Sequence, residues 1–127
     1  ACDDGAKIVA DYTKEVMAVH DEAMAEMGTI ETLRRELNKQ LEEGNAGGTL
    51  DSASVVQLHG TIDALSTAHD GMMDWMHDYE PPKDMEPEAA LEYLKGQMTS
   101  IQQVNEEVKT SIAQAQKLLR KDEAGQE

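Results

Sequence analysis

The chain has 127 residues and no internal change of composition, which indicates one domain without room for a large catalytic core. Its 26 acidic and 11 basic side chains give a formal net charge of -15, which would be repelled by nucleic acid and by anionic membrane surfaces. No nucleic acid partner is therefore expected, and no apolar run approaches the roughly 20 residues that a transmembrane helix needs.

The first residues indicate where the protein is found. Ala1 is followed by Cys2 and then by a polar segment, an order that is typical of bacterial lipoproteins at the point where the signal peptide is cleaved. A cloning remnant or an ordinary terminal cysteine would give the same two letters. On the lipoprotein interpretation Cys2 carries the lipid anchor, residues 1–5 are a flexible tether, and the protein is extracytoplasmic, in the periplasm or at the outer membrane surface.

A first helix is predicted from about residue 6 to residue 43, because apolar residues recur there at steps of three and four. It is expected to end in residues 44–48, where glycine can adopt the left-handed conformation that closes a helix. The apolar stripe includes His20 and consists otherwise of Val9, Tyr12, Val16, Ala23, Met27, Ile30, Leu37 and Leu41.

Two further helices are predicted, over residues 50–79 and 86–121, and residues 123–127 are expected to be a frayed tail. Residues 49–52 supply good N-caps for the second helix, the proline pair at 81–82 ends it, and Pro87 suits the first turn of the third. The stripes are Val55, Leu58, Ile62, Leu65, His69, Met72 and Met76, then Leu91, Leu94, Met98, Ile101, Val104, Val108, Ile112, Ala115 and Leu119.

Three long amphipathic helices joined by short loops favour an all-α fold, an antiparallel up-down-up three-helix bundle that forms a single domain over residues 6–122. The heptad-like spacing favours left-handed packing of the coiled-coil type, with crossing angles of about 20°. A long helical hairpin that completes its core by dimerising is the alternative. The sequence leaves a monomer and a dimer both open.

One eight-residue pattern, His-Asp-x-x-Met-x-x-Met, occurs twice, at residues 20–27 and 69–76. Histidine and methionine bind soft metal ions, and positions i, i+4 and i+7 share one face of a helix. With the first reversal centred near residue 46 or 47, antiparallel pairing joins residues whose numbers sum to about 93. His20 would then face Met73, and Met24 would face His69.

These four residues, His20, Met24, His69 and Met73, form the predicted metal site. Two imidazoles and two thioethers suit Cu(I) better than Zn(II), because thioether sulfur is neutral and polarizable. The aspartates that follow the two histidines are not expected to orient them, since successive helix positions point about 100° apart. The predicted auxiliary ligands are Met17, Met27, Met72 and Met76, with His77 at the rim.

The same residues also suit a structural role, because methionine fills irregular gaps in protein cores. On that interpretation the chain is a non-catalytic scaffold or interaction domain, whose acidic helices bind another protein of the cell envelope. No enzyme is expected on either interpretation, since the sequence lacks a nucleophile elbow, a phosphate-binding loop and a zinc-protease helix. Copper is the only cofactor that the sequence suggests.

Two blocks of the chain resemble short bacterial lipoproteins that are often labelled viral A-type inclusion proteins. The first block is Glu-Val-Met-Ala-Val-His-Asp-Glu-Ala-Met at residues 15–24, followed by Leu33 and Leu37. The second is Met-Met-Asp-Trp-Met-His-Asp-Tyr at residues 72–79. The resemblance covers most of the chain and implies a lipid-anchored helical domain with no established activity. His69 and His77 depart from relatives whose second block is rich in methionine alone.

Overall fold

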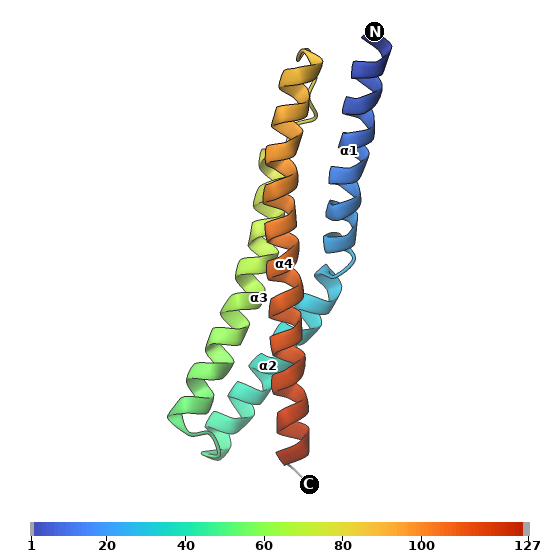
Figure 1. Cartoon of the computed structure of the whole chain (residues 1–127). Coiled ribbons are helices and arrows are strands. Elements are labelled where there is room, and N and C mark those ends of the chain that lie inside the picture. Colours follow the sequence, from blue (N-terminus) through green and yellow to red (C-terminus); the bar gives the residue numbers. More distant parts are fainter. Residues whose placement is uncertain (1, 126–127) are drawn as a thin grey trace.

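The structure, a computed structural model, describes the backbone of residues 2–125 and the side chains of residues 4–120. Its described part has helices as its only regular elements, and these pack against one another, which confirms the predicted all-α class. Figure 1 shows α3 beside α4, α1 along the first half of α4, and α2 continuing from the end of α1 at a slant. The four helices are α1 (Cys2–Met24), α2 (Met27–Gly47), α3 (Ser52–Asp78) and α4 (Pro87–Gly125).

Where the sequence predicted one helix from residue 6 to 43, the structure has two, because the chain leaves helical geometry at Ala25 and Glu26. The backbone N–H of Glu26 donates to the carbonyl of Ala23 at 3.0 Å, one residue closer than in a regular α-helix. Gly28 and Thr29 follow, and both have low helix propensity. The break lets α2 turn away from the line of α1 and pack on α3 and α4.

The ends of the chain also differ from the prediction within the described residues. Residues 2–5 belong to α1 instead of forming a tether, and α4 continues to Gly125 where a frayed tail was expected. Ala1 and residues 126–127 lie outside the described residues, as does the side chain of Cys2. Lipidation of Cys2 and an extracytoplasmic location therefore stay predictions.

The reversal between α2 and α3 uses the predicted turn residues. Gly48 caps α2 in the left-handed conformation, with φ of 65°. Asp51 caps α3 by accepting a hydrogen bond from the backbone N–H of Ser54 at 2.8 Å. This hydrogen bond stabilises the carboxylate and lowers the pKa of Asp51.

Leu50 folds back onto the last turns of α2 at Gly44. A methyl group added at Gly44 would overlap the Leu50 side chain, whereas one added at Gly60 on α3 would meet nothing within 4 Å. We expect Gly44→Ala to lower the free energy of unfolding and Gly60→Ala to raise it by up to about 1 kcal/mol, the helix preference of alanine over glycine. Denaturant unfolding of both variants measures this. Equal stabilisation by both substitutions would contradict the close contact of the Leu50 side chain with Gly44.

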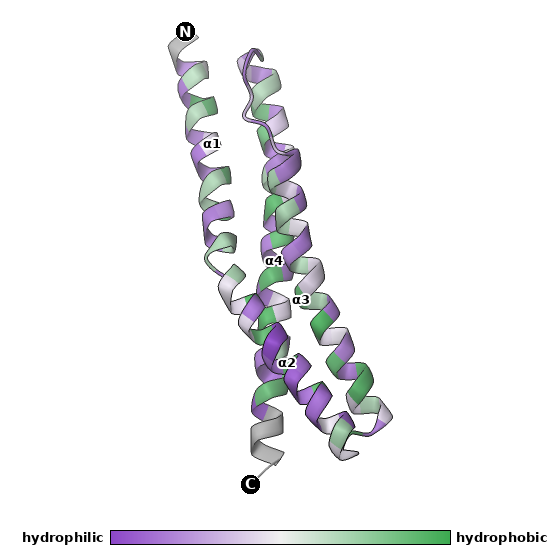
Figure 2. Ribbon diagram, turned by 180° about the vertical axis from the view of Figure 1, so that it is seen from behind, coloured by the Kyte–Doolittle hydropathy of each residue, from purple (hydrophilic) through white to green (hydrophobic). Residues whose placement is uncertain are grey.

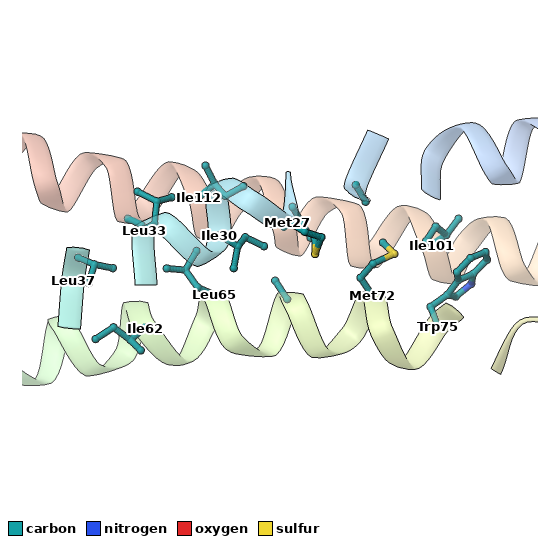
Figure 3. Packing of buried hydrophobic residues seen from close by; sticks show 14 of the residues in the cluster. Met27, Ile30, Leu33, Leu37, Ile62, Leu65, Met72, Trp75, Ile101 and Ile112 are labelled. Atoms are coloured by element: carbon teal, nitrogen blue, oxygen red, sulfur yellow. The ribbon is translucent and has the colours of Figure 1, made fainter. Parts of the chain in front are cut away.

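All four helices contribute to one continuous core, and Figure 2 shows hydrophobic and hydrophilic residues alternating along each ribbon as amphipathic helices require. Figure 3 shows part of this core between α2, α3 and α4. Within the described residues, no helix combines the length and the apolar character needed to cross a membrane. The largest fully buried side chains are Val16, Ile30, Leu37, Leu65, Met72, Leu94, Ile101 and Val108.

Candidate metal site between α1 and α3

The two repeats meet where the side chain of His20 crosses from α1 to α3. Nε2 of His20 lies 2.9 Å from Sδ of Met76, and the His20 side chain is 16% exposed. The imidazole centroid also lies 5.9 Å from that of the Trp75 ring, with the two planes tilted by 34°. His20 therefore contacts the end of the second repeat, through a methionine that the sequence had placed among the auxiliary ligands.

Each histidine of the repeats lies beside the aspartate that follows it. Nδ1 of His20 is 3.1 Å from Oδ1 of Asp21, and Nδ1 of His69 is 3.3 Å from Oδ1 of Asp70. The expectation that these aspartates could not orient their neighbours was wrong, because Nδ1 is the ring nitrogen nearest the backbone and adjacent Cα atoms are only about 3.8 Å apart. A carboxylate at Nδ1 favours a proton there and leaves the lone pair of Nε2 for a ligand.

One flank of α1 is turned to α4. Nζ of Lys109 on α4 donates a hydrogen bond to Oε1 of Glu22 at 3.0 Å, which lowers the pKa of Glu22 and raises that of Lys109. At about 100° per residue, the flank of α1 away from Glu22 carries Met17, His20 and Met24. The contact of His20 with α3 shows that this flank faces α3.

The corresponding flank of α3 carries the second repeat. A side chain at Gly71 would contact Val104 and Glu107, so the Gly71 side of α3 faces α4. His69, Met73 and Met76 follow one another at steps of four and three, and they lie on the other side of α3. The backbones of α1 and α3 come close at almost no point, so long side chains have to fill the space between them.

Six side chains lie on these two flanks, which together are named the α1–α3 seam. All six are partly buried, as expected for residues at the edge of a core. The four predicted ligands are among them. The seam consists of Met17, His20, Met24, His69, Met73 and Met76.

The register of α1 against α3 differs from the prediction by about one helical turn. The contact of His20 with Met76 pairs residue numbers that sum to about 96 instead of about 93. The reversal also lies further along the chain than predicted, because α2 continues to Gly47 instead of ending near residue 43. Met76, one turn beyond Met73, therefore reaches His20.

The other predicted auxiliary residues lie outside the seam. Met72 is 0% exposed and Met27 is 9% exposed, and in Figure 3 both point into the apolar core. The side chain of His77 is 88% exposed and lies beside Asp78, with its Nδ1 3.2 Å from Oδ1 of that residue. Met27 and Met72 thus lie in the core, outside the flanks of α1 and α3 that face each other, and His77 extends into solvent.

A column of aromatic rings beside His20 was missed by the sequence prediction. The Trp75 and Tyr79 rings stack with centroids 4.7 Å apart, and Tyr93 continues the column at 6.3 Å from Tyr79. Burial raises the pKa of the Tyr79 hydroxyl. The i, i+4 spacing of Trp75 and Tyr79 is the signal that would have predicted this stack. The column places an aromatic surface on one side of the imidazole.

Among the side chains that the structure describes, no three histidine, cysteine, aspartate or glutamate residues gather where they could hold a metal ion together. An ion in the α1–α3 seam would therefore depend on methionine sulfur as well as imidazole nitrogen. No family model matches the chain, and neither a curated protein nor a solved structure matches it. The resemblance to the lipoproteins labelled viral A-type inclusion proteins stays a prediction from the two sequence blocks.

Proposed function

We propose that this protein binds a soft metal ion, Cu(I), in the α1–α3 seam, and that it does so as a non-catalytic domain of the cell envelope. The observation that carries the proposal is the contact between His20 and Met76. With the proton of the neutral imidazole on Nδ1 beside Asp21, Nε2 presents a lone pair to the thioether sulfur at 2.9 Å. In that tautomer a cation placed between the two atoms would be bound by both lone pairs. Imidazole and thioether together select a soft cation.

A bound ion requires this pair to open slightly. Metal bonds of roughly 2.0 Å to nitrogen and 2.3 Å to sulfur separate the two atoms by roughly 3.5 to 4.3 Å, from a tetrahedral to a linear arrangement. The present separation is 2.9 Å. Methionine is unbranched and flexible, and Met76 is only partly buried, so its sulfur can move by this amount. The face of Trp75 beside His20 also suits a cation.

The finer architecture that we infer with this function is the up-down-up arrangement of three long helical segments, the first of them broken into α1 and α2. Gly5 lies against Pro87, and Glu22 pairs with Lys109, which supports a parallel course of α1 and α4. The short connection between α2 and α3 supports a reversal there. This arrangement sets the position of α1 along the axis of α3.

Removing both imidazoles tests the proposal. Wild-type protein and the double variant His20→Ala/His69→Ala are titrated with Cu(I) under anaerobic conditions, in competition with a chromophoric Cu(I) chelator. We expect the wild type to withdraw Cu(I) from the chelator and the double variant to lose this ability. His59→Ala is the matched control, since His59 is exposed on α3 and lies outside both repeats. Equal competition by the double variant and the wild type would reject the site.

A scaffold or interaction domain of the envelope is the second candidate function. It is favoured by the packing of four seam methionines, Met17, Met24, Met73 and Met76, against the hydrophobic core. If their role is packing alone, replacing them with leucine keeps the volume and costs less than about 1.5 kcal/mol at each position. The wild type would then show no competition for Cu(I) in the titration above, and the acidic helices would be the surface for an envelope partner.

A further inference from the structure

We propose that the two repeats form two separate metal sites, each with one histidine, instead of one site that shares both imidazoles. This inference rests on the proposed function. The contact between His20 and Met76 carries the first pair, and the packing of α2 on α3, which brings Met27 to the level of His69, carries the second (Figure 3). In each pair the histidine of one repeat is level with the last methionine of the other. The two repeats therefore supply two histidine–methionine pairs.

The two histidines lie too far apart to bind one ion in this register. Met76 is level with His20, and His69 lies about two turns away from Met76 along α3, or roughly 10 Å. Two nitrogens bound to the same ion are at most about 4 Å apart. Because Nε2 of His20 is already turned to Met76, a shared site would require the imidazole to leave that contact.

Met27 lies at the right level for the second pair. Figure 3 shows Met27 on α2 at a level between Leu65 and Met72 of α3, which is the level of His69. Met27 follows the break at residues 25–26, and it is almost fully buried, at 9% exposed. The side chain of His69 is 28% exposed. The second pair thus combines a buried sulfur with an imidazole that is open to solvent.

Each pair gains a third ligand from its own helix. Met24 lies one turn after His20, and Met73 lies one turn after His69, where i and i+4 side chains can reach a common ion. One imidazole and two thioethers form a neutral donor set, which suits a monovalent soft cation. The first site is His20, Met24 and Met76, and the second site is His69, Met73 and Met27.

The sites differ in one feature that an experiment can use. Trp75 is the only tryptophan of the chain, and its ring centroid lies 5.9 Å from that of His20. His69 lies about two helical turns from the level of His20. An ion in the first site should therefore quench the fluorescence of Trp75 more strongly than an ion in the second.

The test is an anaerobic Cu(I) titration that records bound equivalents and Trp75 fluorescence together. We expect two equivalents in the wild type. His20→Ala should bind one equivalent without the strong quenching, and His69→Ala should bind one equivalent with the quenching retained. Met27→Leu, which keeps the core volume, should also lose the second equivalent only. Far-UV circular dichroism checks that each variant stays helical, and His59→Ala is again the control.

Three results would overturn the inference in distinguishable ways. A single equivalent in the wild type that both His20→Ala and His69→Ala remove would show one shared site, and the proposed function would stand. A second equivalent that survives both His69→Ala and Met27→Leu would place that ion elsewhere. No binding by the wild type would reject the proposed function together with the inference.

Discussion

Met76→Leu is expected to weaken the Cu(I) binding that quenches Trp75 by at least about tenfold, equivalent to about 1.4 kcal/mol. Leucine removes the sulfur that lies 2.9 Å from Nε2 of His20 but keeps nearly the same apolar volume. The free energy of unfolding should therefore change by less than about 1.5 kcal/mol. Chelator competition measures the affinity, and denaturant unfolding measures the stability.

Met72→Leu is the matched control for this prediction, because it removes a sulfur from the same helix. Met72 is fully buried in the core and lies outside the α1–α3 seam, so its replacement should leave Cu(I) binding unchanged. If Met76→Leu binds Cu(I) as tightly as the wild type does, the sulfur of Met76 is not a ligand. Equal weakening by both variants would mean that the effect comes from altered packing.

Ile101→Ala is expected to lower the free energy of unfolding by about 2 to 5 kcal/mol, the usual cost of emptying a fully buried aliphatic position. Ile101 is 0% exposed on α4, and Figure 3 shows it close to Trp75. Denaturant unfolding followed by Trp75 fluorescence measures the loss. Ile8→Ala makes the same chemical change at a position that is 53% exposed, and it should stay within about 0.5 kcal/mol of the wild type. Equal losses of stability for the two substitutions would contradict the burial of Ile101 in the core.

The apolar stripes predicted most of the core. Leu65, Leu94 and Ile101 were expected on inward faces and are fully buried. The turn after α2 was also predicted by its chemistry, since Gly48 supplies the left-handed cap. The break at Ala25 and Glu26 was not predicted, because neither residue is proline or glycine and the apolar rhythm continues through it.

The candidate site stays a prediction, and the structure shows one contact between the two repeats that the sequence did not predict. His20, Met24, His69 and Met73 all lie in the α1–α3 seam, as the helical spacing required. His20 contacts Met76, however, which lies one turn beyond the Met73 that the sequence paired with it. The sequence prediction that the aspartates do not orient the neighbouring histidines considered only the angle of about 100° between successive helix positions. It neglected that the two side chains can turn toward each other and bring Oδ1 close to Nδ1.

The sequence by itself determined the helical class and the inward face of each helix. These properties depend on helix hydrogen bonds and side-chain periodicity that act within a few residues of the chain. Only the tertiary structure decided the break after α1 and the contact between His20 and Met76. Both depend on how helices that are distant in sequence pack against one another. A shift of one helical turn along α3 replaces Met73 by Met76 opposite His20 and leaves the apolar spacing of the sequence unchanged.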